Sequence, residues 1–177
     1  MFKKYDKEDI LRCLHYIDDE LNCDYIVQIC GSAAVLLQGY DFRKTFDIDF
    51  TRAPDIVISS VIRKIFKDLP NLNTSVFDER APGVVCLLED YDDRLVEIKD
   101  DFKYLRVYVI SIVDWIVSKL EAPKFGDLLE YTHFLTHERL DFIEDNMHLY
   151  CGLRDDIAKT SLKILKSELN EKYITKL

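Results

Sequence analysis

A glycine–serine turn and a pair of aspartates stand close together in the segment ICGSAAVLLQGYDFRKTFDIDFT, residues 29–51. An apolar run typical of a buried strand precedes Gly31 and Ser32, and a short helical run follows them. The free backbone N–H groups at such a turn favour an anion. Asp47 and Asp49 are two residues apart, so on a strand both carboxylates lie on one face, an arrangement that suits Mg²⁺. The segment therefore predicts a phosphate-binding turn followed by a metal site.

Hydrophobic periodicity predicts alternating helices and strands in residues 1–110 and helices in residues 111–177. The predicted elements are a helix capped by Asp6 and carrying Ile10, Leu14, Ile17 and Leu21, a strand at 25–30, a helix at 32–38, a strand at 47–51, a helix that Pro54 begins, and β-rich segments at 84–89, 94–99 and 105–110. The fold class that follows is α/β (α+β), with a C-terminal helical segment packed on or extending the core.

Two blocks of residues resemble the signature of polymerase-beta-like nucleotidyltransferases. The first is Gly31-Ser32 with Ala34, Leu37 and Gly39, followed by Arg43, Thr45 and Asp47-Ile48-Asp49. The second, Lys119-Leu120-x-Ala122-x-Lys124-x-x-Asp127-Leu128-x-Glu130, is similar to a pattern of the minimal bacterial branch that includes abortive-infection toxins. The resemblance spans residues 25–135 and implies a small mixed sheet with flanking helices of nucleotidyltransferase type.

This resemblance implies a Mg²⁺-dependent enzyme that moves a nucleoside monophosphate from a nucleoside triphosphate to an acceptor hydroxyl, with pyrophosphate leaving. Two Mg²⁺ ions would be held by Asp47, Asp49 and a third carboxylate from a later strand. Gly31 and Ser32 would hold the β- and γ-phosphates. The cations expected to reach the triphosphate are Lys119 and, from its loop, Arg43.

Glu97 is the candidate for the third carboxylate. It lies in the segment 94–99, where Leu95 and Glu97 alternate with Val96 and Ile98 on what is expected to be a central strand. An acid among apolar neighbours there would complete the metal site and could accept the proton of the attacking hydroxyl. Glu89 is the alternative, although the following Asp90 is more typical of a solvated strand end.

The formal net charge of −9 and the pI near 4.9 argue against a broad surface for nucleic acid. Any RNA would therefore be held locally, and the acceptor stays open between RNA, a protein side chain and a small molecule. The resemblance to toxin-type enzymes also allows a toxin–antitoxin component with an antitoxin or another protein as partner.

Five scattered cysteines with no C-x-x-C spacing are typical of buried thiols in a reducing compartment. The N-terminal MFKKYDKED lacks the apolar core of a signal peptide, and no apolar run approaches the roughly 18 residues of a membrane span. The sequence predicts a cytoplasmic protein with no membrane partner.

Two other functions are compatible with parts of this pattern. Asp47-Ile48-Asp49-Phe50-Thr51 also resembles the opening motif of haloacid-dehalogenase-type phosphatases, in which Asp47 would be a nucleophile. Against this, the residues before Asp47 are charged rather than a long apolar strand, and the Gly-Ser turn would be unexplained. The other alternative is a nucleotidyltransferase fold kept as a non-catalytic binding module, which the small size and acidic charge suit.

Overall fold

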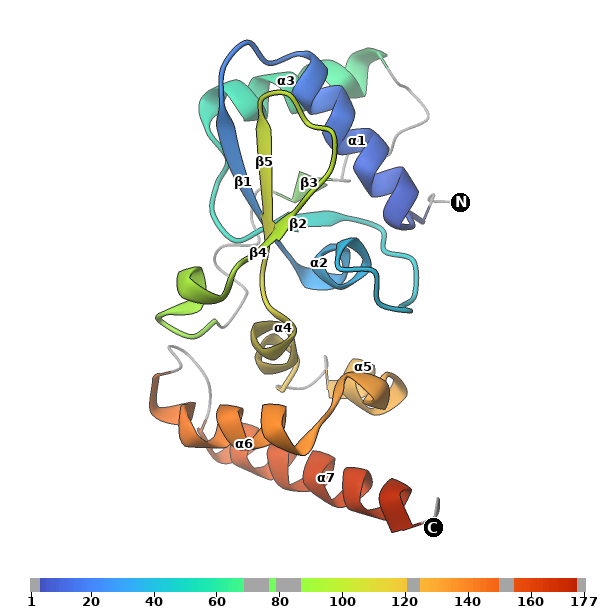
Figure 1. Ribbon diagram of the computed structural model, residues 1–177, viewed down its shortest axis with the longest axis vertical. Coiled ribbons are helices and arrows are strands. Elements are labelled where there is room, and N and C mark those ends of the chain that lie inside the picture. The colour runs from blue at the N-terminus through green and yellow to red at the C-terminus, as the bar shows by residue number, and fades with distance from the viewer. Residues whose placement is uncertain (1–3, 69–76, 79–86, 121–124, 150–154, 175–177) are drawn as a thin grey trace. The chain divides into compact units, whose positions relative to one another are not determined.

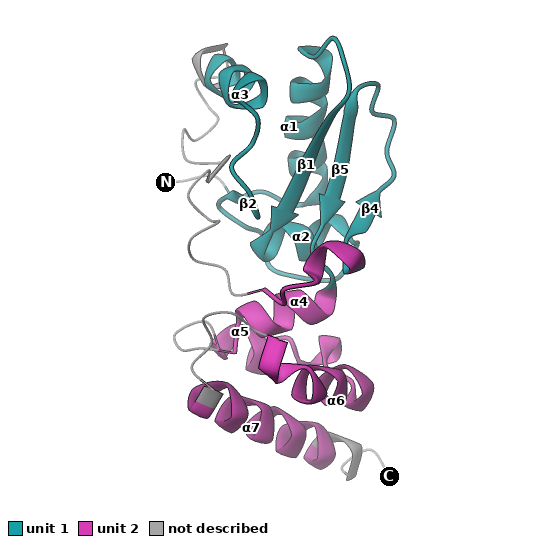
Figure 2. Ribbon diagram, turned by 90° about the vertical axis from the view of Figure 1, so that its left-hand side faces the viewer, with its two compact units in different colours: residues 1–85, 94–111 teal, residues 86–93, 112–177 magenta. Residues whose placement is uncertain are grey.

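The computed structural model describes residues 4–68, 77–78, 87–120, 125–149 and 155–174 (Figure 1). The chain divides into two compact units, coloured separately in Figure 2. The first unit is Met1–Val85 with Arg94–Ser111, and the second is Cys86–Asp93 with Ile112–Leu177. The predicted boundary after residue 110 lies one residue before the end of the first unit, whereas the short segment ending at Asp93 belongs to the second.

The first unit is a mixed sheet with helices packed against it. Its elements are α1 (Lys7–Asp19), β1 (Tyr25–Cys30), α2 (Gly31–Leu37), β2 (Ile48–Phe50), α3 (Ile56–Asp68), β3 (Phe77–Asp78), β4 (Val96–Ile98) and β5 (Leu105–Val109). Within the described residues the sheet has the order β3-β2-β1-β5-β4. β1 pairs in parallel with β5 and antiparallel with β2, β2 pairs in parallel with β3, and β4 pairs antiparallel with β5. The predicted α/β class with a small mixed sheet is confirmed.

Alternating burial on β1 and β5 gives the sheet two different faces. Val27 and Ile29 on β1 are buried, as are their neighbours on β5, and α1 and α2 pack on this side (Figure 2). The opposite face, here called the open face, carries Ile26, whose side chain is 61% exposed, and the exposed Arg106. A large apolar side chain exposed on a central strand is a feature that a folded core does not explain.

The helix α1 follows its sequence pattern closely. The Asp6 carboxylate accepts the Asp9 N–H at 3.0 Å, so Asp6 is the predicted N-cap. At the other end, the buried Asp18 carboxylate accepts backbone N–H groups of Lys103, Tyr104 and Leu105 at 2.7, 2.7 and 2.6 Å. Asp18 therefore ties the end of α1 to the start of β5.

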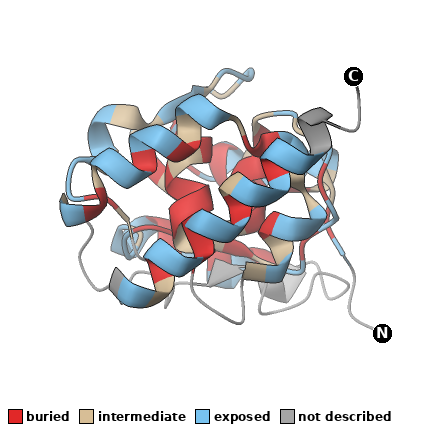
Figure 3. Ribbon diagram, turned by 90° about the horizontal axis from the view of Figure 1, so that it is seen from below, coloured by how far each residue is buried: buried red, intermediate tan, exposed pale blue. Residues whose placement is uncertain are grey.

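The second unit is helical, as predicted for the end of the chain. Its helices are α4 (Ile112–Ser118), α5 (Phe125–Glu130), α6 (His137–Asp145) and α7 (Asp155–Ile174), with 3₁₀ turns at Thr132–Phe134 and Met147–Leu149. Trp115 and Phe134 meet edge to face with their ring centroids 5.4 Å apart, and both are fully buried. Figure 3 shows buried residues along one side of the helices and exposed residues along the other. No helix among the described residues is long and apolar enough to cross a membrane.

Two strands differ from the sequence expectation. The segment 94–99 was expected to hold a central strand, and this is wrong: β4 is an edge strand, paired only with β5 among the strands described. Val96 and Glu97 are both exposed, because water easily reaches both faces of an edge strand. An acid there needs no buried partner, which is why Glu97 among apolar neighbours did not indicate a central strand. β3 was not predicted. Of the β-rich segment expected at 84–89, residues 84–86 lie outside the described residues.

Candidate active site

The glycine of the turn lies against the second aspartate of the pair. Gly31 begins α2 with φ of +65°, a left-handed conformation that glycine adopts without strain. A Cβ atom placed on Gly31 would lie 2.3 Å from the Asp49 Oδ2 atom, far inside van der Waals contact. The structure therefore brings the Gly-Ser turn and the Asp-x-Asp pair together, and only glycine fits between them.

Strand pairing produces this approach. β2 lies antiparallel to β1, with Ile29 opposite Phe50 and Cys30 opposite Asp49. Ile48 and Phe50 are buried on the helix-covered side, whereas Asp47 and Asp49 are half-buried. The alternation predicted for the Asp-x-Asp pair is therefore present, although β2 itself begins one residue after Asp47.

A buried threonine holds the first aspartate. The Thr45 hydroxyl donates to the Asp47 Oδ1 atom at 3.0 Å, and the Thr45 side chain is 2% exposed. Thr45 is itself fixed by two backbone hydrogen bonds with Tyr5, of 2.6 and 3.0 Å. The N-terminal segment thus positions the Asp47 carboxylate through Thr45.

Ser32 follows Gly31 in the first turn of α2 and is 8% exposed. The N-cap of α2 is Cys30, whose side chain makes no capping hydrogen bond. Gly31 and Ser32 therefore occupy the start of a helix beside the Asp49 carboxylate, where backbone N–H groups and a hydroxyl are available to a phosphate.

The basic residues of the 40–46 loop have contacts of their own. Arg43 is exposed, and its guanidinium carbon lies 5.6 Å from the centroid of the Phe42 ring. The Lys44 ammonium binds the Asp6 carboxylate at 2.7 Å, and this hydrogen bond raises the pKa of Lys44. The loop thus offers two cations near the Asp47 strand, of which Lys44 is engaged with the N-cap of α1.

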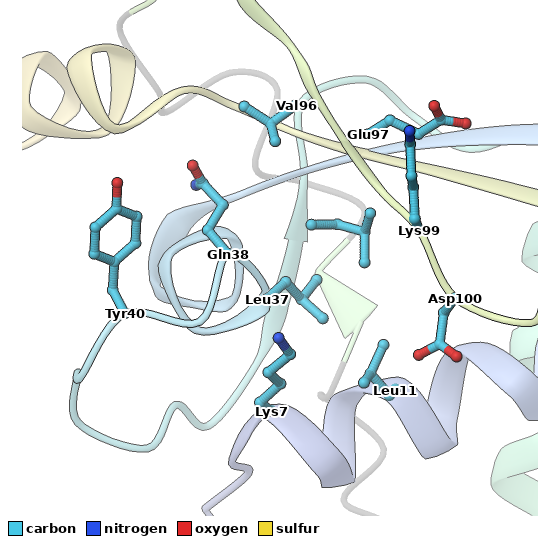
Figure 4. Close-up of a pocket in the computed structure, with 10 residues that line it drawn as sticks. Lys7, Leu11, Leu37, Gln38, Tyr40, Val96, Glu97, Lys99 and Asp100 are labelled. Carbon is cyan, nitrogen blue, oxygen red and sulfur yellow. The ribbon is translucent and has the colours of Figure 1, made fainter.

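Glu97 is not brought beside the aspartate pair. Two strands, β1 and β5, lie between β4 and β2, and at about 4.8 Å per strand this separates their backbones by about 14 Å. Glu97 instead borders a pocket of about 350 Å³ on the edge of the sheet (Figure 4). Lys7 of α1 and Gln38 at the end of α2 line this pocket with Glu97 and Lys99.

A carboxylate residue that the sequence analysis missed lies next to Asp49. β3 pairs in parallel with β2, and Asp78 is the register partner of Asp49. The signal available in the sequence was the run Val76-Phe77-Asp78, an acid following two β-forming residues. The backbone of Asp78 therefore lies on the strand beside Asp49, where a later strand was expected to bring Glu97.

Lys119 lies in the second unit, directly after α4. Its ammonium binds the Asp127 carboxylate at 3.0 Å, with the two side chains 12% and 18% exposed, and lies 5.8 Å from the centroid of the Trp115 ring. The Asp127 carboxylate thus fixes the position of the Lys119 ammonium. Glu130 is exposed at the end of α5, and Ala122 and Lys124 lie outside the described residues.

The side chains at this site carry the type of ligand atom that magnesium prefers. Asp47 and Asp49 provide hard oxygen ligands, one of them held by the Thr45 hydroxyl, and the absent side chain of Gly31 leaves room beside the other. The described side chains contain no cluster of three or more His, Cys, Asp or Glu residues able to hold a metal. Among the described side chains, Asp47 and Asp49 are thus the carboxylates that this site offers to a metal.

A protein-family model matches most of the chain. The model of a family described as "Nucleotidyltransferase of unknown function (DUF6036)" matches residues 7–142. The matched region contains the Gly-Ser turn, the aspartate pair and Lys119. No curated protein and no solved structure matches the chain.

Proposed function

The chain belongs to this nucleotidyltransferase family, and from that premise we propose that it transfers a nucleoside monophosphate from a nucleoside triphosphate to a hydroxyl group, with Mg²⁺ as cofactor. The observation that carries the proposal is the contact between the Gly31 backbone and the Asp49 carboxylate. A helix start is suited to phosphate and a carboxylate is suited to Mg²⁺, and a triphosphate–metal complex would need both groups side by side.

In the proposed reaction the acceptor oxygen forms a bond to the α-phosphorus while the bond to the β-phosphate oxygen breaks. Pyrophosphate leaves, and the hydroxyl proton passes to a carboxylate of the site or to water. Asp47 and Asp49 would hold the metal, which when bound stabilises the attacking and leaving oxygens. Gly31 N–H and the Ser32 hydroxyl would bind the β- and γ-phosphates. Thr45 would keep the Asp47 carboxylate in place.

For the third carboxylate we favour Asp78 over Glu97. Asp78 is one strand from Asp49 and in register with it, whereas Glu97 is three strands away. Comparing Asp78→Asn with Glu97→Gln separates the two assignments. We expect Asp78→Asn to remove the Mg²⁺-dependent activity and Glu97→Gln to keep it, and the reverse result would restore Glu97.

Lys119 and Arg43 complete the proposed nucleotide contacts as cations for the triphosphate. The pairing of Lys119 with Asp127 gives it a structural role as well. If Lys119 contacts the nucleotide, Lys119→Gln should weaken triphosphate binding. If its role is purely structural, the substitution should lower only the stability of the second unit.

The reaction is tested with each α-³²P-labelled nucleoside triphosphate, Mg²⁺ and a bacterial extract containing RNA and protein. We expect label to be transferred to the acceptor, and to stay with the free nucleotide when Asp47→Asn/Asp49→Asn replaces the wild type. Asp19→Asn, an exposed acid on α1, is the matched control and should behave like the wild type. Sensitivity of the label to nuclease or protease then identifies RNA or protein as the acceptor.

Nucleotide binding and release of free phosphate, measured alongside the transfer of label, separate the alternatives. Nucleotide binding without any transfer would favour a non-catalytic binding module. Release of inorganic phosphate through a covalent intermediate on Asp47 would favour a phosphatase, which the family match speaks against. A toxin–antitoxin role with a protein partner stays a prediction from the toxin-type resemblance.

A further inference from the structure

Four residues on the two central strands form a surface that neither the helices nor the proposed metal site accounts for. Ile26 and Gln28 of β1 lie opposite Arg106 and Tyr108 of β5 in the parallel register. All four are on the open face, because their neighbours Val27 and Val107 are buried on the other side. We call these four residues the β1–β5 patch.

The patch lies on the same face as Asp49 and within reach of it. Asp49 is opposite Cys30 of β1. Gln28 lies two residues before Cys30 on β1, so the backbones of Gln28 and Cys30 are about 7 Å apart. The hydroxyl of Thr51, the residue after β2, donates to the Gln28 Oε1 atom at 2.9 Å, so these two side chains lie on one face. Tyr108 lies one strand further on. A group joined to a phosphate at Asp49 would therefore extend over Gln28 to Tyr108.

The chemistry of the patch suits a nucleoside better than a phosphate. Tyr108 offers a half-buried aromatic ring, and Ile26 offers an exposed apolar side chain diagonally across from it. Gln28 and Arg106 occupy the other diagonal, so polar groups alternate with apolar ones. Aromatic and apolar side chains bind the face of a base, while amide and guanidinium groups read its edge.

Charge around the patch supports the same choice. Arg106 also lines a hollow of about 350 Å³ beside β4, whose charged residues are Asp24, Glu97, Lys99, Asp100, Lys103 and Arg106. Three acids and three bases balance there, so the surroundings hold no excess positive charge for a polyanion. A neutral nucleoside does not require an excess of positive charge at its binding surface.

We propose that the β1–β5 patch binds the nucleoside of the incoming triphosphate, with the base on Tyr108 and Ile26 and the sugar over Gln28. This inference rests on the proposed nucleotidyltransferase function and adds its nucleoside subsite. Base preference would be set by Arg106, the register partner of Ile26, while the Gln28 amide would contact the sugar.

The test measures binding by calorimetry in Mg²⁺ with two kinds of probe. The first is the set of α,β-methylene analogues of the four nucleoside triphosphates, which bind without being transferred, and the second is inorganic tripolyphosphate, which lacks a nucleoside. We expect Tyr108→Ala to weaken binding of the preferred analogue by about 10-fold, the size expected for loss of one stacked aromatic ring. Tripolyphosphate binding should be unchanged.

Three further variants serve as controls for the Tyr108→Ala result. Tyr108→Phe keeps the ring and should bind the analogue like the wild type. Tyr16→Ala removes a 43% exposed tyrosine on α1 and is the matched control. Because Ile26 is 61% exposed, Ile26→Asn should leave folding intact and still weaken analogue binding, even if Tyr108→Ala does not fold.

The outcomes distinguish the failure of this inference from failure of the proposed function. If Tyr108→Ala and Ile26→Asn bind the analogue normally but transfer less label, the patch binds the acceptor and the nucleoside assignment is overturned. If the wild-type protein binds neither the analogues nor tripolyphosphate, the proposed function itself fails and the nucleoside subsite fails with it.

Discussion

At the scale of single residues, position 31 imposes two constraints that only glycine satisfies. Its positive φ disfavours any residue with a Cβ, and the Asp49 carboxylate occupies the space that a Cβ would need. Position 39 imposes only the backbone constraint. The φ of Gly39 is +83°, but a Cβ there would have the Lys7 Nζ as its nearest atom, at 3.6 Å, which is ordinary contact. The two glycines therefore form a natural pair for separating backbone strain from crowding of the site.

We predict that Gly31→Ala abolishes label transfer and that Gly39→Ala does not. Both substitutions should lower the free energy of unfolding by roughly 1–2 kcal/mol, the cost of a left-handed conformation for an alanine. Only Gly31→Ala also displaces the Asp49 carboxylate. Thermal unfolding measures the shared cost, and transfer from labelled triphosphate measures the difference. Equal activity in the two variants would contradict the importance of the Gly31–Asp49 contact.

The sequence could predict that the Gly-Ser turn and the Asp-x-Asp pair lie together because these residues are close in the chain. Gly31 and Asp49 are only 18 positions apart, and the antiparallel β1–β2 pairing that joins them is local. Asp78 was missed because its place depends on the parallel pairing of β3 with β2, across an intervening helix. Glu97 was favoured because alternation along a strand does not say whether that strand is central or at an edge.

At the scale of elements, Asp18 joins α1 to β5. Burial by itself would raise the pKa of Asp18, but the N–H groups of Lys103, Tyr104 and Leu105, with the nearby His15, outweigh burial and lower it. A lowered pKa in the folded state means that the ionised carboxylate stabilises the fold. This contribution is fully present above the pKa of the unfolded chain, near 3.8, and is lost as the pH falls through the lower folded value.

We predict that Asp18→Asn lowers the free energy of unfolding by about 1.5–3 kcal/mol at pH 7, the range for hydrogen bonds to a charged group. The difference from the wild type should shrink as the pH falls below about 4, because the unfolded chain then binds a proton that the folded carboxylate still excludes. Urea unfolding at pH 7 and at pH 3 measures this. Asp19→Asn removes the exposed neighbouring charge and should change stability little at either pH. A constant Asp18→Asn effect across this range would contradict the assignment.

Most elements could be predicted from the chain because their patterns are local. Periodic apolar residues and the Asp6 cap predicted α1, and a continuous apolar run predicted β1 over the same six residues that the structure shows. The short strands were harder, because β2, β3 and β4 contain two or three residues each and their existence depends on partners elsewhere in the sheet.

At the scale of the whole molecule, the division into units could be predicted only in part. The change to helices near residue 111 is visible in the sequence, but the return of Cys86–Asp93 to the second unit is not. It depends on contacts such as the Glu89 N–H donating to the Leu149 carbonyl at 3.3 Å, between residues 60 positions apart, and on the burial of Leu88. Such contacts leave no pattern in a single sequence.

The helix α7 is an integral part of the second unit by its burial. Ala158, Leu162, Leu165 and Leu169 are buried along one side, and the Ser161 hydroxyl donates to the Leu120 carbonyl at 2.8 Å. The Lys166 ammonium binds the Asp141 carboxylate of α6 at 2.6 Å. An apolar stripe with polar anchors of this kind belongs to a packed core rather than to a dispensable tail.

We therefore predict that Leu165→Ala lowers the free energy of unfolding by about 2–5 kcal/mol, as expected for a fully buried leucine, and that Ile164→Ala costs less than about 1 kcal/mol. Ile164 is the preceding residue on the same helix and is 43% exposed, so the two residues differ in burial while sharing a helix. Chemical denaturation of both variants measures the difference. A chain that ends at residue 154 should lose the cooperative unfolding of its helical part, because it lacks the whole apolar side of α7. Intact folding of that shortened chain, or equal costs for the two substitutions, would show that the second unit is complete without this helix.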